Sequence, residues 1–197
     1  MSSPSVMSSG RMEAFSDGVI AILITIMVLD LKVPKGTDLA ALRPLLHTFL
    51  CYSMSFVYLA IYWNNHHHML HTVKAVDGVI LWANMHLLFW LSLVPFVTVW
   101  VGENPTAPMP AALYGCVLLM AAVSYTILQG RILAKQGPES ALARAVGQDF
   151  KGKASLALYA GAILLAFLHP WFAGGIYALV ALIWLVPDRR IERVLAD

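Results

Sequence analysis

Six long apolar stretches separated by polar connections run along the chain, and each is a candidate for a membrane-spanning helix. They cover about residues 15–33, 45–65, 78–101, 110–133, 154–168 and 172–186. A straight helix needs about 20 apolar residues to cross a hydrocarbon core of ~30 Å, so the last two stretches are short. Pro95 predicts a kink in the third stretch, and the HPWFAGG connection predicts that the last two form a helical hairpin.

Composition agrees with this pattern. Hydrophobic residues make up 59% of the 197 positions and charged residues only 12%, which is about half the charged share of a soluble domain. The sequence therefore predicts an all-α, polytopic membrane protein in which residues 1–197 form one unit of six transmembrane helices. Cys51 and Cys116 both fall inside apolar stretches, which predicts small buried side chains rather than a disulfide.

Lysine and arginine are distributed unevenly between the two sides of this six-helix arrangement. Ten lie on the side of the two termini, namely Arg11, Lys74, Arg131, Lys135, Arg144, Lys151, Lys153, Arg189, Arg190 and Arg193. The other side has three, namely Lys32, Lys35 and Arg43. Because basic residues are enriched in cytoplasmic loops, both termini are expected in the cytoplasm. The same rule explains the basic residues of segment 131–153, so they give no reason to expect nucleic-acid binding.

The first apolar stretch begins with polar side chains, in the segment RMEAFSDGVIAILITIMVLDL. At about 100° per residue, one stripe of this helix contains Gly18, Ile22, Thr25, Ile26 and Leu29, and it extends back to Phe15 and Arg11. Asp17 points about 140° away from Ile22. The pattern alone leaves two alternatives open for each feature. The stripe suits either lipid or a neighbouring helix, and Ser16 with Asp17 suits either an N-terminal cap or a polar network.

The second apolar stretch ends in the polar segment YWNNHHHMLH, at the predicted depth of Asp17. The candidate partners of Asp17 and Arg11 there are His66, His67, His68 and His71, because polar side chains at membrane depth usually face the interior of a bundle. A polar network is favoured over a metal site, since no HExxH motif occurs and Asp77 lies six residues beyond His71. We expect no metal ion, no cofactor and no enzymatic activity, because no nucleophile or metal-ligand set can be assembled.

Several of these segments resemble one family. Arg11, followed after three residues by Phe15-Ser16-Asp17, resembles the RxxxFSD signature of the transmembrane protein 175 family, the endosomal and lysosomal potassium channels and their bacterial homologues. The segments GVIAILITIMVLDLKVP, YWNNHH and WLSLVPF are also similar to that family. The resemblance implies a homotetramer with one six-helix unit per chain, whose pore lies on the fourfold axis and is lined by the first helix.

The resemblance also implies roles for particular residues. It places the narrowest pore constriction at Ile22, further apolar rings at Ile26 and Leu29, and a pore-facing hydroxyl at Thr25. It implies a supporting network of Arg11, Phe15, Ser16 and Asp17 with a histidine of the second helix, for which His66 and His67 fit best. The family has no TVGYG-type filter, and that motif does not occur in this sequence.

The function implied is a potassium-permeable cation channel with modest preference for potassium over sodium, in the cell membrane of a bacterium. Its expected partners are membrane lipid and copies of itself, with no small-molecule substrate and no bound cofactor other than permeant K⁺. The main alternative is a secondary ion transporter of the inner membrane. Transporters usually show internal repeats, broken helices and an ionisable midplane site, whereas this sequence offers only the break at Pro95.

Overall fold

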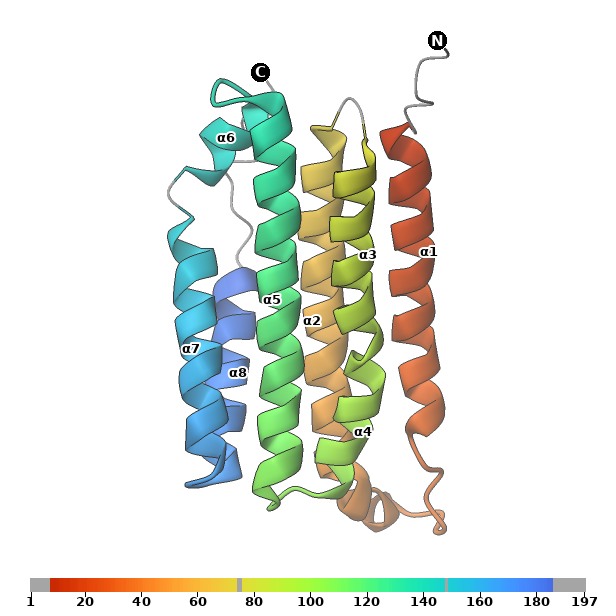
Figure 1. The fold of residues 1–197 in the computed structure, drawn as a ribbon. Helices are drawn as coiled ribbons and strands as arrows, with labels where there is room; N and C mark the ends of the chain where they lie inside the picture. Colours follow the sequence, from red (N-terminus) through yellow and green to blue (C-terminus); the bar gives the residue numbers. More distant parts are fainter. Residues whose placement is uncertain (1–7, 74–75, 148, 186–197) are drawn as a thin grey trace.

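The structure is a computed structural model that describes residues 8–73, 76–147 and 149–185, and it is a bundle of upright helices (Figure 1). The α-helices are α1 (Ser9–Met27), α2 (Leu46–His71), α3 (Gly78–Ser92), α4 (Val94–Glu103), α5 (Pro108–Gln136), α6 (Ala141–Val146), α7 (Phe150–Ala166) and α8 (Pro170–Leu185). Short 3-10 helices cover Val28–Asp30 and Leu39–Leu45. Four segments are long and apolar enough to cross a membrane, residues 9–30, 39–71, 78–103 and 108–136, so the chain is a multi-pass membrane protein.

The six predicted stretches correspond to α1, α2, α3 with α4, α5, α7 and α8, but several boundaries differ. Helix α1 begins at Ser9 rather than near residue 15, and Met12 in this additional part of the helix packs into the core. Helix α2 continues past Asn65 to His71, so the histidines lie on the helix itself. Helix α6 was not predicted. Lys74, Arg189, Arg190, Arg193 and the end of the last predicted stretch at residue 186 lie outside the described residues.

The predicted kink at Pro95 coincides with a one-residue interruption at Leu93 between two helices. Helix α3 ends at Ser92, and Pro95 lies in the first turn of α4. Proline has no amide hydrogen, so it is tolerated in a first turn and not in a helix interior. The Leu93 N–H donates a hydrogen bond to the Trp90 carbonyl oxygen at 3.2 Å, a contact between residues three apart. The Val97 N–H donates to the Leu93 carbonyl oxygen at 3.1 Å, which is the first helical hydrogen bond of α4.

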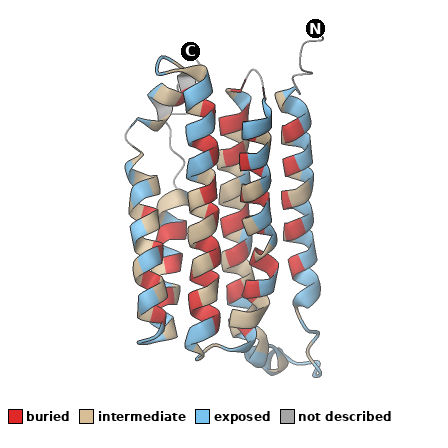
Figure 2. Cartoon of the chain, viewed as in Figure 1, coloured by how far each residue is buried: buried red, intermediate tan, exposed pale blue. Residues whose placement is uncertain are grey.

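Helix α5 lies in the middle of the bundle and α1 at its edge (Figure 1). Helix α5 packs on α3, α4, α7 and α8, whereas α1 packs on α2, α3 and α4. Helices α7 and α8 form the expected antiparallel hairpin. Buried residues of α1 lie on the side that faces the other helices, and its opposite side is exposed (Figure 2). One complete side of α1 is therefore not covered by any of the residues that the structure describes in a single chain.

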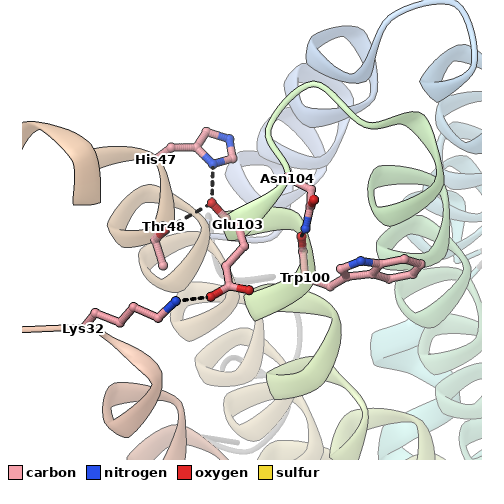
Figure 3. A network of polar contacts seen from close by, with 7 residues as sticks. Lys32, His47, Thr48, Trp100, Glu103 and Asn104 are labelled. Atoms are coloured by element: carbon pink, nitrogen blue, oxygen red, sulfur yellow. Dashed lines mark hydrogen bonds and ion pairs between the residues drawn. The ribbon is translucent and has the colours of Figure 1, made fainter.

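Polar contacts join the segment after the C-terminal end of α1 to the C-terminal end of α4 (Figure 3). Lys32, which follows α1, forms an ion pair with Glu103 at the end of α4. On α2, the Thr48 hydroxyl donates to the Gly102 carbonyl oxygen at 3.1 Å, and His47 Nδ1 lies 3.2 Å from the same oxygen. These contacts satisfy a carbonyl at the C-terminal end of α4, where no amide hydrogen of the helix is available.

At the other end of the bundle, Asp77 joins α3 to α5. Its Oδ1 accepts from the Ile80 N–H at 2.9 Å and so caps the start of α3. Its Oδ2 accepts from Lys135 Nζ at 2.8 Å, and this charge-assisted bond holds the pKa of the Asp77 carboxyl below its ordinary value. Both ends of the bundle therefore have polar contacts between helices that are distant in sequence.

Close packing of α5 on the α7–α8 hairpin depends on Gly115. A Cβ atom added there would lie 2.1 Å from Tyr177 Oη and 2.8 Å from Ile163 Cγ1. Tyr177 is buried and its hydroxyl donates to the Ala111 carbonyl oxygen at 3.0 Å, so the ring cannot simply swing away. We expect Gly115→Ala to lower the free energy of unfolding by about 1–3 kcal/mol through overpacking, measured by thermal denaturation in detergent.

Gly161 on α7 is the matched control for this prediction. A Cβ atom there would meet nothing within 4 Å. Because alanine is a better helix former than glycine by up to about 1 kcal/mol, Gly161→Ala is expected to leave stability unchanged or raise it. Equal melting temperatures for the two variants would contradict the packing role assigned to Gly115.

Candidate functional site: the exposed face of α1 and its polar support

Helix α1 has one face that packs into the chain. Its buried residues are Met12, Ser16, Ile20, Leu23 and Met27, spaced three or four apart. This spacing places them on one stripe of an α-helix. Ser16 lies about 120° around the helix from Ile22, so the packing stripe and the predicted pore stripe point in different directions.

The predicted pore residues Ile22, Thr25 and Ile26 lie on the exposed side of α1, and Leu29 lies exposed in the short 3-10 helix that follows it. Exposed fractions are 59% for Ile22, 39% for Ile26 and 80% for Leu29, and Thr25 is exposed as well. Phe15, one turn before Gly18 on the same stripe, is 53% exposed. A large apolar stripe that the described part of its own chain leaves uncovered indicates a surface that meets lipid or another protein chain.

Thr25 differs from its apolar neighbours on this stripe. Its hydroxyl lies within hydrogen-bond distance of two carbonyl oxygens of its own helix, 3.0 Å from that of Ala21 and 2.9 Å from that of Ile22. The hydroxyl hydrogen is therefore committed to the helix backbone. The lone pairs of Oγ1 remain available on the exposed face, where they can accept a hydrogen bond or contact a cation.

A buried chain of hydrogen bonds joins α1, α2 and α3. His66 Nε2 lies 2.7 Å from Asn84 Oδ1, and Asn84 Nδ2 donates to Ser16 Oγ at 2.9 Å. The Ser16 hydroxyl donates in turn to the Met12 carbonyl oxygen at 2.8 Å. A carboxamide oxygen can only accept, so His66 carries its hydrogen on Nε2. Every donor then points towards α1, an arrangement in which neighbouring hydrogen bonds strengthen one another.

Burial makes this chain of bonds important for stability. His66 and Ser16 are fully buried, and Asn84 is almost so. A buried polar group that loses its partner costs about 1–3 kcal/mol, which exceeds the net gain from forming an ordinary hydrogen bond. The three residues therefore favour one arrangement of α1 against α2 and α3.

The structure separates the other predicted network residues. Asp17 Oδ1 accepts from Trp63 Nε1 at 3.0 Å, so its partner on α2 is an indole and not a histidine. Phe15 lies on the exposed stripe. The Arg11 side chain is exposed and makes no hydrogen bond or ion pair with the residues that the structure describes. Only Ser16 and His66, of the six predicted residues, join the buried chain.

His67 lies beside Glu13 of α1. Its Nδ1 is 2.9 Å from Glu13 Oε1, within ion-pair distance but without the alignment of a hydrogen bond. His71, one helical turn later, places Nε2 3.6 Å from the same oxygen. The polar end of α1 therefore contacts α2 twice, through Asp17 with Trp63 and through Glu13 with the two histidines.

Sequence reasoning missed Glu13 and Asn84. Glu13 lies one helical turn before Asp17, and this i, i+4 spacing marks neighbouring positions on a helix. Asn84 is a single amide within the apolar run GVILWANMHLL, and such a residue usually faces a partner inside the bundle. Both signals were present in the sequence, but neither identifies the partner.

The contact between Asp17 and Trp63 gives a prediction about α1. Asp17→Ala removes a hydrogen bond to a charged acceptor, which is worth about 1.5–3 kcal/mol, so we expect lower stability and less assembled protein. Asp17→Asn keeps an acceptor for the indole and is expected to lose less. Assembly is measured by size-exclusion chromatography and ion preference by flux. Normal assembly of Asp17→Ala with altered ion preference would contradict the structural role.

Comparisons with known proteins agree on one family. The sequence model of the family described as "Endosomal/lysosomal potassium channel TMEM175" matches residues 11–95. A potassium channel of Chryseobacterium sp. is 54% identical, with 97% of this chain and 100% of the relative covered. A potassium channel of Chamaesiphon minutus is 30% identical, with 91% of this chain and 94% of the relative covered.

The fold agrees with the sequence comparisons. The crystal structure of a lysosomal potassium-selective channel TMEM175 homolog from Chamaesiphon minutus matches with a TM-score of 0.81 and 28% identity. The match covers 91% of this chain and 97% of that chain. The matched family is one of ion channels and not of enzymes.

Proposed function

Because this chain belongs to the TMEM175 channel family, we propose that it is a potassium-permeable cation channel formed by four copies of the chain. Relatives of similar length are named potassium channels, which supports the choice of ion. The observation that carries the proposal is the exposed stripe of α1. An edge helix that packs by one face and leaves an apolar, threonine-containing face free is suited to line a pore shared by several chains.

The gate in this proposal is a ring of Ile22 side chains. Four isoleucines around an axis form a hydrophobic constriction, and water leaves such a constriction when it is narrow. An ion then has to lose its hydration shell to pass, which raises a large barrier. A small outward movement of α1 readmits water and lowers that barrier. Ile26 and Leu29 extend the apolar lining by one and two further turns.

Selectivity in this proposal comes from Thr25. Four outward-facing Oγ1 atoms, whose hydrogens are committed to the α1 backbone, offer lone pairs to a partly dehydrated cation. Potassium sheds part of its hydration shell more easily than sodium, so a ring of this kind prefers potassium. Because a hydroxyl ring is a coarser sieve than a cage of backbone carbonyls, we propose a modest preference for potassium over sodium.

The proposed orientation has both termini in the cytoplasm of a bacterium, with the protein in the cell membrane. The excess of basic residues on that side supports it. Helices α7 and α8 complete six crossings per chain in this proposal. Helix α8 runs back towards the end of the bundle where α1 begins, as an even number of crossings requires (Figure 1).

Reconstitution into liposomes tests the proposed function. We expect potassium flux that does not saturate in the manner of a carrier and exceeds the sodium flux measured under matched gradients. Native mass spectrometry of the purified protein is expected to give four chains. Flux that saturates and requires a co-transported ion would replace the channel with the alternative, a secondary transporter, for which the break between α3 and α4 is the relevant feature.

A further inference from the structure

We propose that Glu13, His67 and His71 form a binding site for a divalent transition-metal ion, with Zn²⁺ as the best match. The site joins the first turns of α1 to the last turns of α2. It shares no residue with the buried chain of hydrogen bonds from His66 to Met12 or with the exposed stripe that contains Ile22. The sequence disfavours a metal here because no HExxH motif occurs and Asp77 lies six residues beyond His71, whereas the fold brings Glu13 of another helix to the two histidines.

The geometry suits one metal ion. Oε1 of Glu13, Nδ1 of His67 and Nε2 of His71 all lie within 4.8 Å of one another. Glu13 Oε1 is 2.9 Å from the His67 nitrogen and 3.6 Å from the His71 nitrogen. A zinc ion with bonds of about 2.0–2.2 Å holds its tetrahedral ligands roughly 3.3 Å apart. The two distances to Glu13 Oε1 lie on either side of that value, and the two histidine nitrogens lie within 4.8 Å of each other, so modest side-chain movement brings the three atoms to one ion.

The ligand types favour zinc over calcium or magnesium. Two imidazoles and one carboxylate are the ligands of a borderline transition metal, whereas calcium and magnesium require oxygen ligands. His67 and His71 are four residues apart, so both rings lie on the same face of α2. Three protein ligands leave one position of a tetrahedral site for water.

The site is preorganised on one side and open on the other. The His67 ring stacks on Trp63, with 5.8 Å between centroids and 22° between planes, which restrains the plane of the imidazole. Glu13 is mostly buried, with 18% of its side chain exposed, while the side chain of His71 is 53% exposed. His67 Nδ1 is buried and accepts or donates no hydrogen bond within the described residues. A metal ion entering past His71 gives that nitrogen a partner.

Metal binding at this site affects the proposed function through α1. Widening the ring of Ile22 requires α1 to move relative to its neighbours, and a metal that ties its first turns to α2 opposes that movement. This consequence rests on the proposed channel function, whereas the metal site itself does not. We therefore expect Zn²⁺ to reduce potassium flux when it reaches the side of the membrane on which α1 begins.

Binding is tested by isothermal titration of Zn²⁺ into the purified, tag-free protein in detergent. We expect one ion per chain, with affinity reduced at least about tenfold in His71→Ala and in Glu13→Gln. His71 is exposed and outside the buried chain, so its variant is expected to fold even if Glu13→Gln does not. Co²⁺ in place of Zn²⁺ reports the coordination directly through its visible absorption.

His68→Ala is the matched control, because His68 belongs to the same histidine tract and its ring contacts that of His67, but it supplies no ligand atom. Wild-type affinity in that control, together with loss in the two ligand variants, supports the site. Equal binding by wild type and His71→Ala overturns it, and so does an equal loss in His68→Ala. Zinc binding with unchanged potassium flux overturns the coupling to α1. Absence of any potassium flux contradicts the proposed function, and in that case the zinc titration still tests the metal site.

Discussion

Replacing Ile22 with asparagine is expected to raise potassium flux through the reconstituted protein on the order of tenfold, since about 1.4 kcal/mol off a barrier produces a change of that size. In the proposed channel Ile22 forms a ring that excludes water, and an amide side chain of similar size retains water there. The flux is measured in liposomes with a potassium-sensitive dye, at matched protein content. The single-channel conductance is expected to rise in parallel.

Leu182→Asn on α8 is the matched control for this change. Leu182 is 62% exposed and Ile22 is 59% exposed, so the two variants place the same amide on similarly exposed positions of different helices. The control is expected to conduct like the wild type. A conductance for Ile22→Asn that equals those of the wild type and the control would remove Ile22 from the gate.

The second large effect is expected at Asn84. Asn84→Ala takes away the acceptor for the His66 Nε2–H and the donor to Ser16 Oγ, within a site that excludes water. Leaving the imidazole without a partner and opening a small cavity should cost about 3 kcal/mol. For a chain of this size that corresponds to a fall in melting temperature of roughly 6–12 °C, measured by fluorescence-detected thermal denaturation in detergent.

Two variants separate this effect from the loss of any amide. Asn104→Ala removes an exposed asparagine whose Nδ2 donates to the Trp100 carbonyl oxygen, and it is expected to change stability by less than about 0.5 kcal/mol. The double variant His66→Leu with Asn84→Leu replaces both partners by apolar groups and is expected to recover part of the loss. If Asn104→Ala and Asn84→Ala have the same melting temperature, the buried chain of hydrogen bonds does not stabilise the protein as described.

Much of the fold follows from hydrophobicity and helical periodicity. Four predicted stretches correspond to segments of membrane-spanning length, and the spacing of Ile22, Ile26 and Leu29 placed these residues on one stripe that the structure leaves exposed. Boundaries were less accurate because hydrophobicity measures contact with lipid, whereas a helix continues into water as long as its backbone is satisfied. The polar turn at Arg11 and the extension of α2 to His71 are both of this kind.

The polar contacts were harder to predict. The sequence placed Asp17 near a group of histidines, but a period of 100° per residue does not say which ring turns towards which helix. The structure pairs Asp17 with Trp63 and His66 with Asn84, and Asn84 lies on α3, whereas the sequence pattern indicates partners on α2 alone. Glu13 and His67 meet only because α1 packs on α2, a relation between segments that no local pattern contains.

The central claim is that the exposed stripe of α1 lines the path of the ions. It is tested most directly by potassium flux through Ile22→Cys, with Cys51 and Cys116 replaced by serine, before and after reaction with a charged, water-soluble thiol reagent. The proposal predicts that the reagent blocks most of the flux at position 22 and leaves a Leu182→Cys protein unaffected. A conducting protein in which Cys at position 22 is fully modified without loss of flux would contradict it.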